Sequence, residues 1–507
     1  MATGVGGSSI IVSFVTVLTM GLGVLNQIVI AKYYGASAEL DSYLIAAATP
    51  SIFSGVALTL FSSILVPSLT AIKTDREKFS EAVSTLTTLA VIGTIVLVLV
   101  GMAGKAFILE LLTGLMGDDL SLAIRLAGYV WIGTGLSVLS SFFTSLHYLD
   151  KQFTFPALLG LLPTAGMMLG TVTLSRSVGI EGLVVGWLAT MIVACLILLP
   201  IVFQSGFSLE KIGLGNRHAK EFMHALLPVT VGILPFTILP AIDAYWVSRL
   251  PEGSMAYLGY CARIVAGMGS LVMSGIYVVI LPYLAENVAE NDLDAFLRRL
   301  QLAIKYVLMV TIPIVTFFLF FGRDFVCVLF ERGQFNEEST GAVATLLPFY
   351  LIGLLAMAPT TILSKGYLAL KRYQGFGVLG VIVVAVYCVM AGVFSRYYSF
   401  YGIGLAHALY WTLFFCAGLG LLRRNVLTRN TLTATLKCAV CSIVSSAIAS
   451  VVLSRSAEMH VGMALLLEGC LAMVLFVLLA YFLRFPELRE LSARVLLLIK
   501  KQEKYSL

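Results

Sequence analysis

Apolar runs of about 20 residues recur along almost the whole chain, and they constrain its fold more than any other feature. One helix needs a run of this length to cross the hydrocarbon core of a membrane, which is about 30 Å thick. Short polar segments separate the runs, and prolines such as Pro50, Pro67 and Pro282 lie in or near them. The pattern predicts an all-α polytopic membrane protein with about fourteen transmembrane helices.

The composition supports this class and excludes others. Hydrophobic residues make up 59% of the 507 residues and charged residues 12%, against about 25% charged in soluble domains. No basic run with interleaved aromatics supports nucleic-acid binding, and no HExxH, GxSxG or Walker A motif supports an enzyme or direct use of ATP. Cys438 and Cys441 form a CxxC inside an apolar stretch, which indicates packing rather than a metal or redox site. No metal or cofactor is expected, apart from a coupling cation or proton.

The basic residues predict the orientation in the membrane. With the N-terminus placed inside, 23 of the 33 Lys and Arg residues fall in inside segments, as expected for cytoplasmic loops. Both termini are therefore expected in the cytoplasm of a bacterial inner-membrane protein. The first residues lack Lys, Arg and a clear cleavage site, so they are interpreted as the start of the first span. Residues 486–507 predict a basic amphipathic helix on the membrane surface.

Two pairs of matching segments indicate an internal repeat. Pro67 in "SSILVPSLTAIKTDREKF" matches Pro282 in "YVVILPYLAENVAENDLDAF", and Tyr148 matches Tyr367. The second copy begins six spans after the first, which predicts a parallel repeat about an axis along the membrane normal. The expected parts are an N-lobe (1–215, helices 1–6), a C-lobe (216–430, helices 7–12), helices 13 and 14 (431–485) and the tail (486–507). Two equivalent lobes favour a transporter that works by alternating access.

Arg263 lies inside the apolar run "MAYLGYCARIVAGMGSLVM". A charge within the bilayer costs about 2.5–3.5 kcal/mol on insertion scales, so such charges usually face a cavity or a partner. A guanidinium matches phosphate and carboxylate groups with two parallel hydrogen bonds. We therefore predict that Arg263 faces the substrate cavity. The alternatives are a bond to a carboxylate on another helix, or a side chain that extends to the membrane surface.

Other polar residues in or beside the spans are further candidates for substrate contact. Asp41, Asn26, Gln27 and Lys32 belong to the first two spans, where bonds between helices explain the two amides equally well. Asp243 is a candidate for coupling to a cation or proton, with an ion pair to Arg249 or Arg263 as the alternative. Glu468 stands in the middle of the last span and has no assigned role.

Three segments resemble the MurJ/MviN family of the multidrug/oligosaccharidyl-lipid/polysaccharide exporter superfamily. They are "IVIAKYYGASAELDSYLIAAATP" (28–50), "DAYWVSRLPEGSMAYLGYCARI" (243–264) and "VLFERGQFNEEST" (328–340). The resemblance implies a flippase for lipid II, an undecaprenyl-pyrophosphate-linked disaccharide-pentapeptide, driven by membrane potential or ions. It further implies a lipid-tail groove at helices 13 and 14. Arg263 matches the family's eighth-helix arginine, Asp41 an acidic residue of the second helix, and Asp243 an aspartate at a cation site.

The chain departs from the family where the family is usually basic. Met20 and Asn26 stand where the first helix usually carries two arginines, and a basic pair near Ser54 and Gly55 is absent. The predicted function is a flippase for a polyprenyl-pyrophosphate-linked glycan, either lipid II or a related envelope or exopolysaccharide precursor, with envelope glycan polymerases as partners. A drug/cation antiporter and a non-transporting scaffold for glycan assembly are the alternatives.

Overall fold

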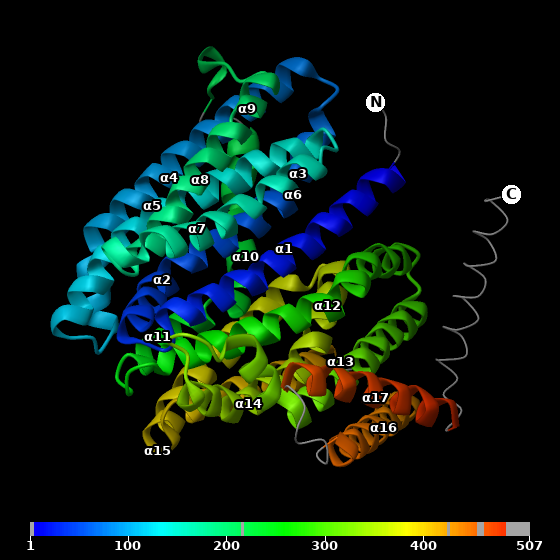
Figure 1. Ribbon diagram of the computed structural model, residues 1–507. Coiled ribbons are helices and arrows are strands. Elements are labelled where there is room, and N and C mark those ends of the chain that lie inside the picture. The colour runs from blue at the N-terminus through cyan, green and yellow to red at the C-terminus, as the bar shows by residue number, and fades with distance from the viewer. Residues whose placement is uncertain (1–4, 214–216, 423–425, 454–460, 483–507) are drawn as a thin grey trace, which may run out of the picture. The chain divides into compact units, whose positions relative to one another are not determined.

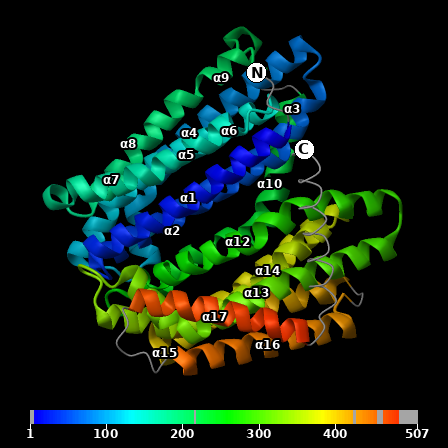
Figure 2. The same ribbon diagram turned by 45° about the vertical axis from the view of Figure 1, so that its right-hand side comes forward.

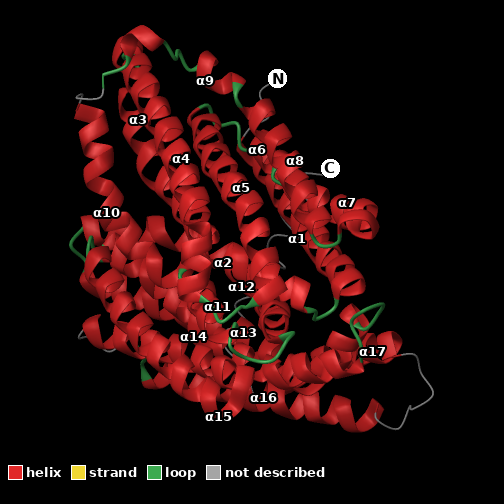
Figure 3. Cartoon of the chain, turned by 90° about the vertical axis from the view of Figure 1, so that its left-hand side faces the viewer, coloured by secondary structure: helices red, strands yellow, loops and turns green. Residues whose placement is uncertain are grey.

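The computed structural model describes residues 5–213, 217–422, 426–453 and 461–482, and nearly all of these residues are helical. Figure 3 shows the helices joined by short loops. Within the described ranges the one strand-like pairing is a bridge between Arg332 and Phe335. The predicted all-α class is confirmed. The predicted surface helix at residues 486–507 lies outside the described residues.

Seventeen helices, one π-helical turn and one 3₁₀ turn follow each other along the described chain (Figure 1). The first eleven elements are α1 (Val5–Tyr34), α2 (Ala38–Leu60), η1 (Phe61–Leu65), α3 (Val66–Ile72), α4 (Arg76–Leu112), α5 (Gly117–Leu149), α6 (Thr154–Leu159), α7 (Leu161–Val178), α8 (Glu181–Leu198), α9 (Pro200–Gln204) and η2 (Leu209–Lys211). The others are α10 (Arg217–Thr237), α11 (Leu239–Val247), α12 (Ser254–Ala289), α13 (Leu293–Phe330), α14 (Glu337–Ala369), α15 (Tyr373–Leu422), α16 (Arg429–Leu453) and α17 (Val461–Phe482).

The number of helices that can cross a membrane agrees with the prediction of about fourteen. Among the described residues, 12 helices are long and apolar enough, and the bent pair 229–237 and 239–247 makes a thirteenth span. Helix α15 has 50 residues with a non-helical Ser399 (φ 53°) inside. At 1.5 Å per residue it is about 75 Å long, more than twice the thickness of the hydrocarbon core. It therefore counts as two spans, which brings the total to about fourteen.

The described chain divides into two compact units that interleave along the sequence. Unit 1 contains Met1–Arg263, Phe330–Val343 and Tyr373–Tyr410, and unit 2 contains Ile264–Leu329, Ala344–Arg372 and Trp411–Leu507. The lobe boundaries that follow from the repeat, at residues 215 and 430, stay a prediction.

In unit 1, glycines allow α7 and α8 to pack with their backbones in contact. A Cβ atom at Gly170 would lie 2.2 Å from the carbonyl oxygen of Gly182, and one at Gly186 would lie 2.2 Å from that of Gly166. No larger residue fits at these positions. Small residues at such contacts are typical of membrane helices, whose association depends on close packing rather than on the hydrophobic effect.

An apolar cluster in unit 1 holds the end of α5 against the segment after α8. Phe61 of η1 meets Phe142 of α5 with ring centroids 5.4 Å apart, and Leu146 and Ile201 are buried in the same cluster. Close packing of these side chains holds this end of the unit together. The cluster includes Leu146 and Leu149, so it fixes the end of α5 that carries His147.

In unit 2, α16 and α17 lie side by side (Figure 2). Cys438, Cys441 and Ala480 are completely or almost completely buried where they meet, and the Cys438 thiol lies 3.6 Å from the Met309 carbonyl oxygen. Both cysteines of the CxxC therefore pack as small apolar residues.

Candidate functional site

Asp41 of α2 caps the N-terminal end of α12. Its two carboxylate oxygens accept hydrogen bonds from the backbone N–H groups of Gly253 (2.8 Å) and Ala256 (2.7 Å). The first N–H groups of a helix have no partner within the helix, and the helix dipole favours a negative charge beside them. The side chain is buried, with 8% of its surface exposed. Both oxygens of Asp41 are thus used in joining α2 to α12.

A second acidic residue makes the reciprocal contact. Glu252, just before α12, accepts a hydrogen bond from the backbone N–H of Ala38 at the start of α2 (2.9 Å). The predicted repeat pairs α2 with α12, since Pro67 and Pro282 stand 215 residues apart, and Asp41 and Ala256 have the same separation. The backbone N–H at the start of α2 therefore bonds to Glu252, just before α12. The N–H groups at the start of α12 bond in turn to Asp41 of α2.

The "ERGQF" segment between α13 and α14 is built onto the end of α1. The backbone N–H of Gln334 donates to the Lys32 carbonyl oxygen at 3.0 Å. Gly333 has a φ of +63°, and a Cβ atom there would lie 2.3 Å from that same oxygen. Glycine adopts this backbone conformation without strain, and it alone leaves the required space. The glycine of the motif is therefore explained by its contact with α1.

Tyr260 of α12 connects these segments from inside. Its hydroxyl donates to the Gly35 carbonyl oxygen at 2.7 Å, and its ring packs against Phe330 and Phe335 with centroids 5.0 and 5.1 Å away. The three segments that carry the family resemblance thus meet in one place within unit 1. We call this place the α2–α12 junction and define it by Gly35, Asp41, Glu252, Tyr260 and Gln334.

Arg263 lies on α12 nine residues beyond Ser254, about 13 Å along the helix axis. Its side chain is exposed and lies within electrostatic reach of Tyr43 on α2. Within the part of the chain that the structure describes, its guanidinium has no ion pair or hydrogen bond. A bond to a helix carboxylate, one of the alternatives considered, is absent there. Its counterpart in the repeat, Ala48, is buried.

Lys32, Gln27 and Asn26 lie on different sides of α1. The Lys32 ammonium is exposed and lies 5.8 Å from the Tyr33 ring, whereas Gln27 is half-buried. Asn26 is buried, and its amide nitrogen lies 3.2 Å from the Met167 sulfur of α7. Its oxygen has no hydrogen-bond partner among the described residues. Asn26 therefore faces the contact between α1 and α7, as the helix-bonding interpretation proposed.

Asp243 of α11 is buried and bonded to one group from α15. Its carboxylate accepts a hydrogen bond from the Tyr387 hydroxyl, and 8% of its surface is exposed. The expected alternative, an ion pair with Arg249 or Arg263, is not found. Arg249 instead donates to the Tyr245 carbonyl oxygen and lies over the Tyr245 ring, 4.2 Å from its centre. The bond that Tyr387 makes to Asp243 was missed at the sequence level.

Other tyrosines of α15 support the break between α10 and α11. The two helices are bent by 43° at this break, and Pro240 near the start of α11 has no N–H to donate. Tyr410 donates to the Pro235 carbonyl oxygen, and Tyr373 donates to that of Gly232 at 3.1 Å. A broken membrane helix persists when neighbouring groups satisfy its freed backbone. A tyrosine inside an apolar run indicates such a bond at the sequence level, because a buried hydroxyl needs a hydrogen-bond partner.

Glu468 of α17 is the remaining buried carboxyl group among the residues singled out. Its side chain is 9% exposed, and one of its oxygens has no hydrogen-bond partner among the described residues. Asp324 of α13 is close enough to interact with it electrostatically. No group of three or more His, Cys, Asp or Glu side chains that could hold a metal ion occurs in the described ranges.

The fold, with its broken span, its paired helix ends and an arginine without an ion pair among the described residues, is that of a polytopic membrane protein and is compatible with a transporter. The family model described as lipid II flippase MurJ matches residues 30–476. The chain therefore belongs to the lipid II flippase MurJ family, and the resemblance stated from the three segments is confirmed. It is a multi-pass protein of the bacterial inner membrane.

Two relatives illustrate the similarity. A probable lipid II flippase MurJ of Vibrio cholerae is 25% identical over 423 residues, which cover 79% of this chain and 80% of the relative. One of Treponema pallidum is 24% identical over 379 residues, which cover 71% of each chain.

Solved structures show the same fold. A lipid II flippase MurJ in an inward closed conformation superposes with a TM-score of 0.81 at 22% identity, covering 94% of this chain and 99% of that one. An inward-facing multidrug resistance transporter of the MATE family gives 0.67 at 15% identity, covering 80% of this chain and 94% of that one. The comparisons thus do not favour the antiporter alternative.

Proposed function

We propose that the protein carries lipid II, or a polyprenyl-pyrophosphate-linked glycan of the same class, across the cytoplasmic membrane by alternating access. The match of the lipid II flippase family to residues 30–476 carries this proposal. That stretch contains every residue of the α2–α12 junction. Transport of this kind breaks no covalent bond, so the protein acts as a transporter and not as an enzyme, and envelope glycan polymerases use the glycan after it has crossed.

Arg263 is the group that we assign to the pyrophosphate. It is exposed, it has no hydrogen bond or ion pair with the described residues, and it is held on a helix rather than on a loop. A planar guanidinium can donate two parallel hydrogen bonds to neighbouring phosphate oxygens. Lys32, also exposed, adds a second positive charge, and Gln27 adds a neutral donor.

The α2–α12 junction supports a role in closing one side of the substrate path. Asp41 and Glu252 each bond to the N-terminal end of the opposite helix, so opening the junction leaves both helix ends without these acceptors. Under this proposal Asp41 acts by holding α2 and α12 together while Arg263 holds the substrate. The two residues then have different roles, although both were first considered as substrate ligands.

The pair of Asp243 and Tyr387 is our candidate for energy coupling. A buried carboxyl with one phenol donor can take up either a proton or a monovalent cation, because one of its oxygens has capacity for a further bond. The site also adjoins the bent pair of helices α10 and α11. The distribution of Lys and Arg supports an orientation with both termini in the cytoplasm.

The test is a flipping assay with the purified full-length protein in vesicles, using lipid II with a fluorescent label and an impermeant quencher. The wild-type protein is expected to move lipid II between leaflets. Arg263→Ala removes charge-assisted hydrogen bonds worth about 2 kcal/mol, so the rate at low substrate is expected to fall about 30-fold. Arg263→Lys keeps the charge and is expected to retain part of the activity.

Arg176→Ala is the matched control, since Arg176 is an exposed arginine at the end of α7. It is expected to leave the rate unchanged. A wild-type protein that moves neither lipid II nor another polyprenyl-pyrophosphate glycan would refute the proposed function. A wild-type protein that moves a differently substituted glycan and not lipid II would reassign the substrate within the class.

A further inference from the structure

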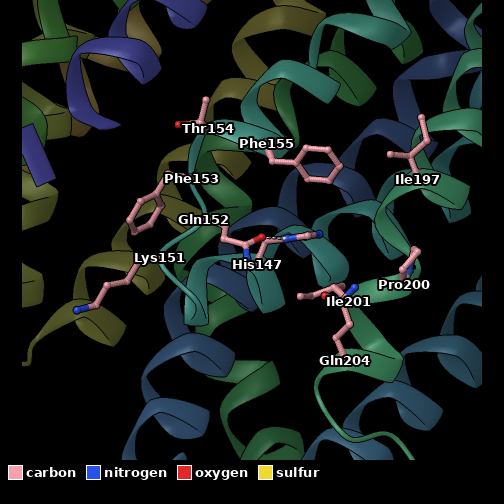
Figure 4. Close-up of a pocket in the computed structure, with 10 residues that line it drawn as sticks. All are labelled: His147, Lys151, Gln152, Phe153, Thr154, Phe155, Ile197, Pro200, Ile201 and Gln204. Carbon is pink, nitrogen blue, oxygen red and sulfur yellow. Dashed lines mark hydrogen bonds between the residues drawn. The ribbon is translucent and has the colours of Figure 1, made fainter. Parts of the chain in front are cut away.

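A pocket of about 520 Å³ opens at the end of α5, away from the residues assigned to transport. It is lined from α5, from the segment that leads into α6, and from α8 and α9, all of which belong to unit 1. Figure 4 shows the residues that line it, among them His147, Lys151, Gln152, Phe155 and Ile197. The volume falls within the range of about 300–1,000 Å³ that is typical of small-molecule sites.

His147 is a buried polar side chain with one ring nitrogen unused. Its side chain is 6% exposed, and its Nδ1 lies 3.0 Å from the Gln152 side-chain oxygen (Figure 4). Its Nε2 is buried without a hydrogen-bond partner among the described residues. Leaving such a group unsatisfied costs about 1–3 kcal/mol. The pocket beside it is where a partner can enter.

The charges around His147 favour an anionic partner. Which ring nitrogen carries the hydrogen depends on the tautomer, and with a hydrogen on Nε2 the ring can donate to an anionic oxygen in the pocket. His147 lies in the last turn of α5, where the helix dipole favours a cation. The negative charge of Asp150 is paired with Lys73 at 2.7 Å. Lys151 at the rim is exposed and adds a positive charge there, and its side chain points away from the His147 ring (Figure 4).

Phe155, Ile197 and Ile201 form an apolar wall of the pocket. Phe155 packs against the His147 ring at 5.3 Å and, like Ile197, is about two-fifths exposed. The spans Gly117–Leu149 and Glu181–Gln204 both end here. The ends of membrane spans lie near the headgroup region of a bilayer. The pocket therefore combines a buried polar ring and a positive charge at its rim with an apolar wall.

We propose that this pocket binds the phosphate of an anionic membrane phospholipid, with His147 Nε2 and Lys151 on the phosphate and the start of the acyl chains against Phe155 and Ile197. None of the residues that line the site is assigned to transport, so the site goes beyond the proposed transport function. It is also confined to the first copy of the repeat. Tyr148 and Tyr367 correspond, so the counterpart of His147 is Gly366, where a Cβ atom would already lie 3.4 Å from Leu300.

The test is native mass spectrometry of the full-length protein taken from nanodiscs that contain phosphatidylglycerol or phosphatidylcholine. The wild-type protein is expected to retain one phosphatidylglycerol molecule that the double variant His147→Gln, Lys151→Ala retains about 10-fold less. Ile197→Trp, which fills the pocket from an exposed position, is expected to reduce retention equally without a loss of charge. Lys211→Ala is the control, because this exposed lysine lies outside the pocket.

Each outcome decides the proposal. If the wild type, the double variant and Ile197→Trp retain phosphatidylglycerol equally, the pocket is not the binding site. Equal retention of phosphatidylcholine overturns the anionic ligand. Inorganic phosphate that displaces the lipid and binds with the same dependence on His147 makes this a free-phosphate site and overturns the lipid. The proposal is supported if the double variant and Ile197→Trp both lose phosphatidylglycerol while their thermal unfolding midpoints stay at the wild-type value. Lys211→Ala should retain the lipid as the wild type does.

Discussion

The α2–α12 junction and the contact between α11 and α15 each bury one carboxyl group, but they satisfy it differently. Asp41 receives two backbone N–H groups from the start of α12, and Asp243 receives one phenol hydroxyl from Tyr387. Both side chains are 8% exposed. A carboxylate whose two oxygens are both bonded to a helix end is part of the architecture. One with a spare oxygen and a single partner can bind something else.

The largest effect is expected at Asp41. Asp41→Ala removes two charge-assisted hydrogen bonds and leaves the start of α12 uncapped, which should cost about 3 kcal/mol of stability. Asp41→Asn keeps one acceptor and should cost about half as much. The measurement is the unfolding midpoint of the purified protein in detergent. An unchanged midpoint for Asp41→Ala would mean that Asp41 does not hold the junction.

A smaller effect is expected at Tyr387. Tyr387→Phe leaves Asp243 without its donor, which should destabilise the protein by about 2 kcal/mol and change how transport depends on pH or on monovalent cations. Tyr410→Phe is the comparison, because it removes a phenol bonded to the Pro235 carbonyl oxygen instead of to a carboxylate. It should lower stability alone. The transport rate of each variant, measured in vesicles over a range of pH values and sodium concentrations, distinguishes Tyr387→Phe from Tyr410→Phe. Identical profiles for both variants would refute the coupling role.

The smallest effect is expected at Glu252, the exposed half of the junction. Glu252→Gln keeps an oxygen that can accept from the Ala38 N–H and loses only an exposed charge near a helix end. The cost should stay below about 1 kcal/mol. The same unfolding measurement applies. A loss as large as that of Asp41→Ala would show that burial does not distinguish the two halves of the junction.

Much of the fold could be predicted because membrane spans are long and apolar. The approximate number of spans is an example, because α15 with its interruption at Ser399 contributes two of them and the bent pair at α10 and α11 contributes one. The partners of polar residues could not be predicted in the same way. A membrane helix is apolar all round, so its sequence does not show which side faces another helix and which faces a cavity.

Asn26, Asp41 and Arg263 illustrate this limit. All three are polar residues in or beside apolar runs, and all three were candidates for substrate contact. The structure places Asn26 against Met167 and Asp41 on the end of α12, and it leaves Arg263 exposed. The three environments differ because each helix is rotated differently about its own axis. That rotation depends on neighbouring helices that are far away in the sequence.

The sequence by itself determined the class, the approximate number of spans and the family, because hydrophobic length and short motifs are local properties. Only the tertiary structure decided why the motifs exist. Gly333 of "ERGQF" needs its φ of +63° because the Lys32 carbonyl oxygen lies where a side chain would be, and Asp41 is needed where the first N–H groups of α12 arrive. These demands come from segments about 215 to 300 residues apart in the chain, and a hydrogen bond is specified only when both of its partners are in place.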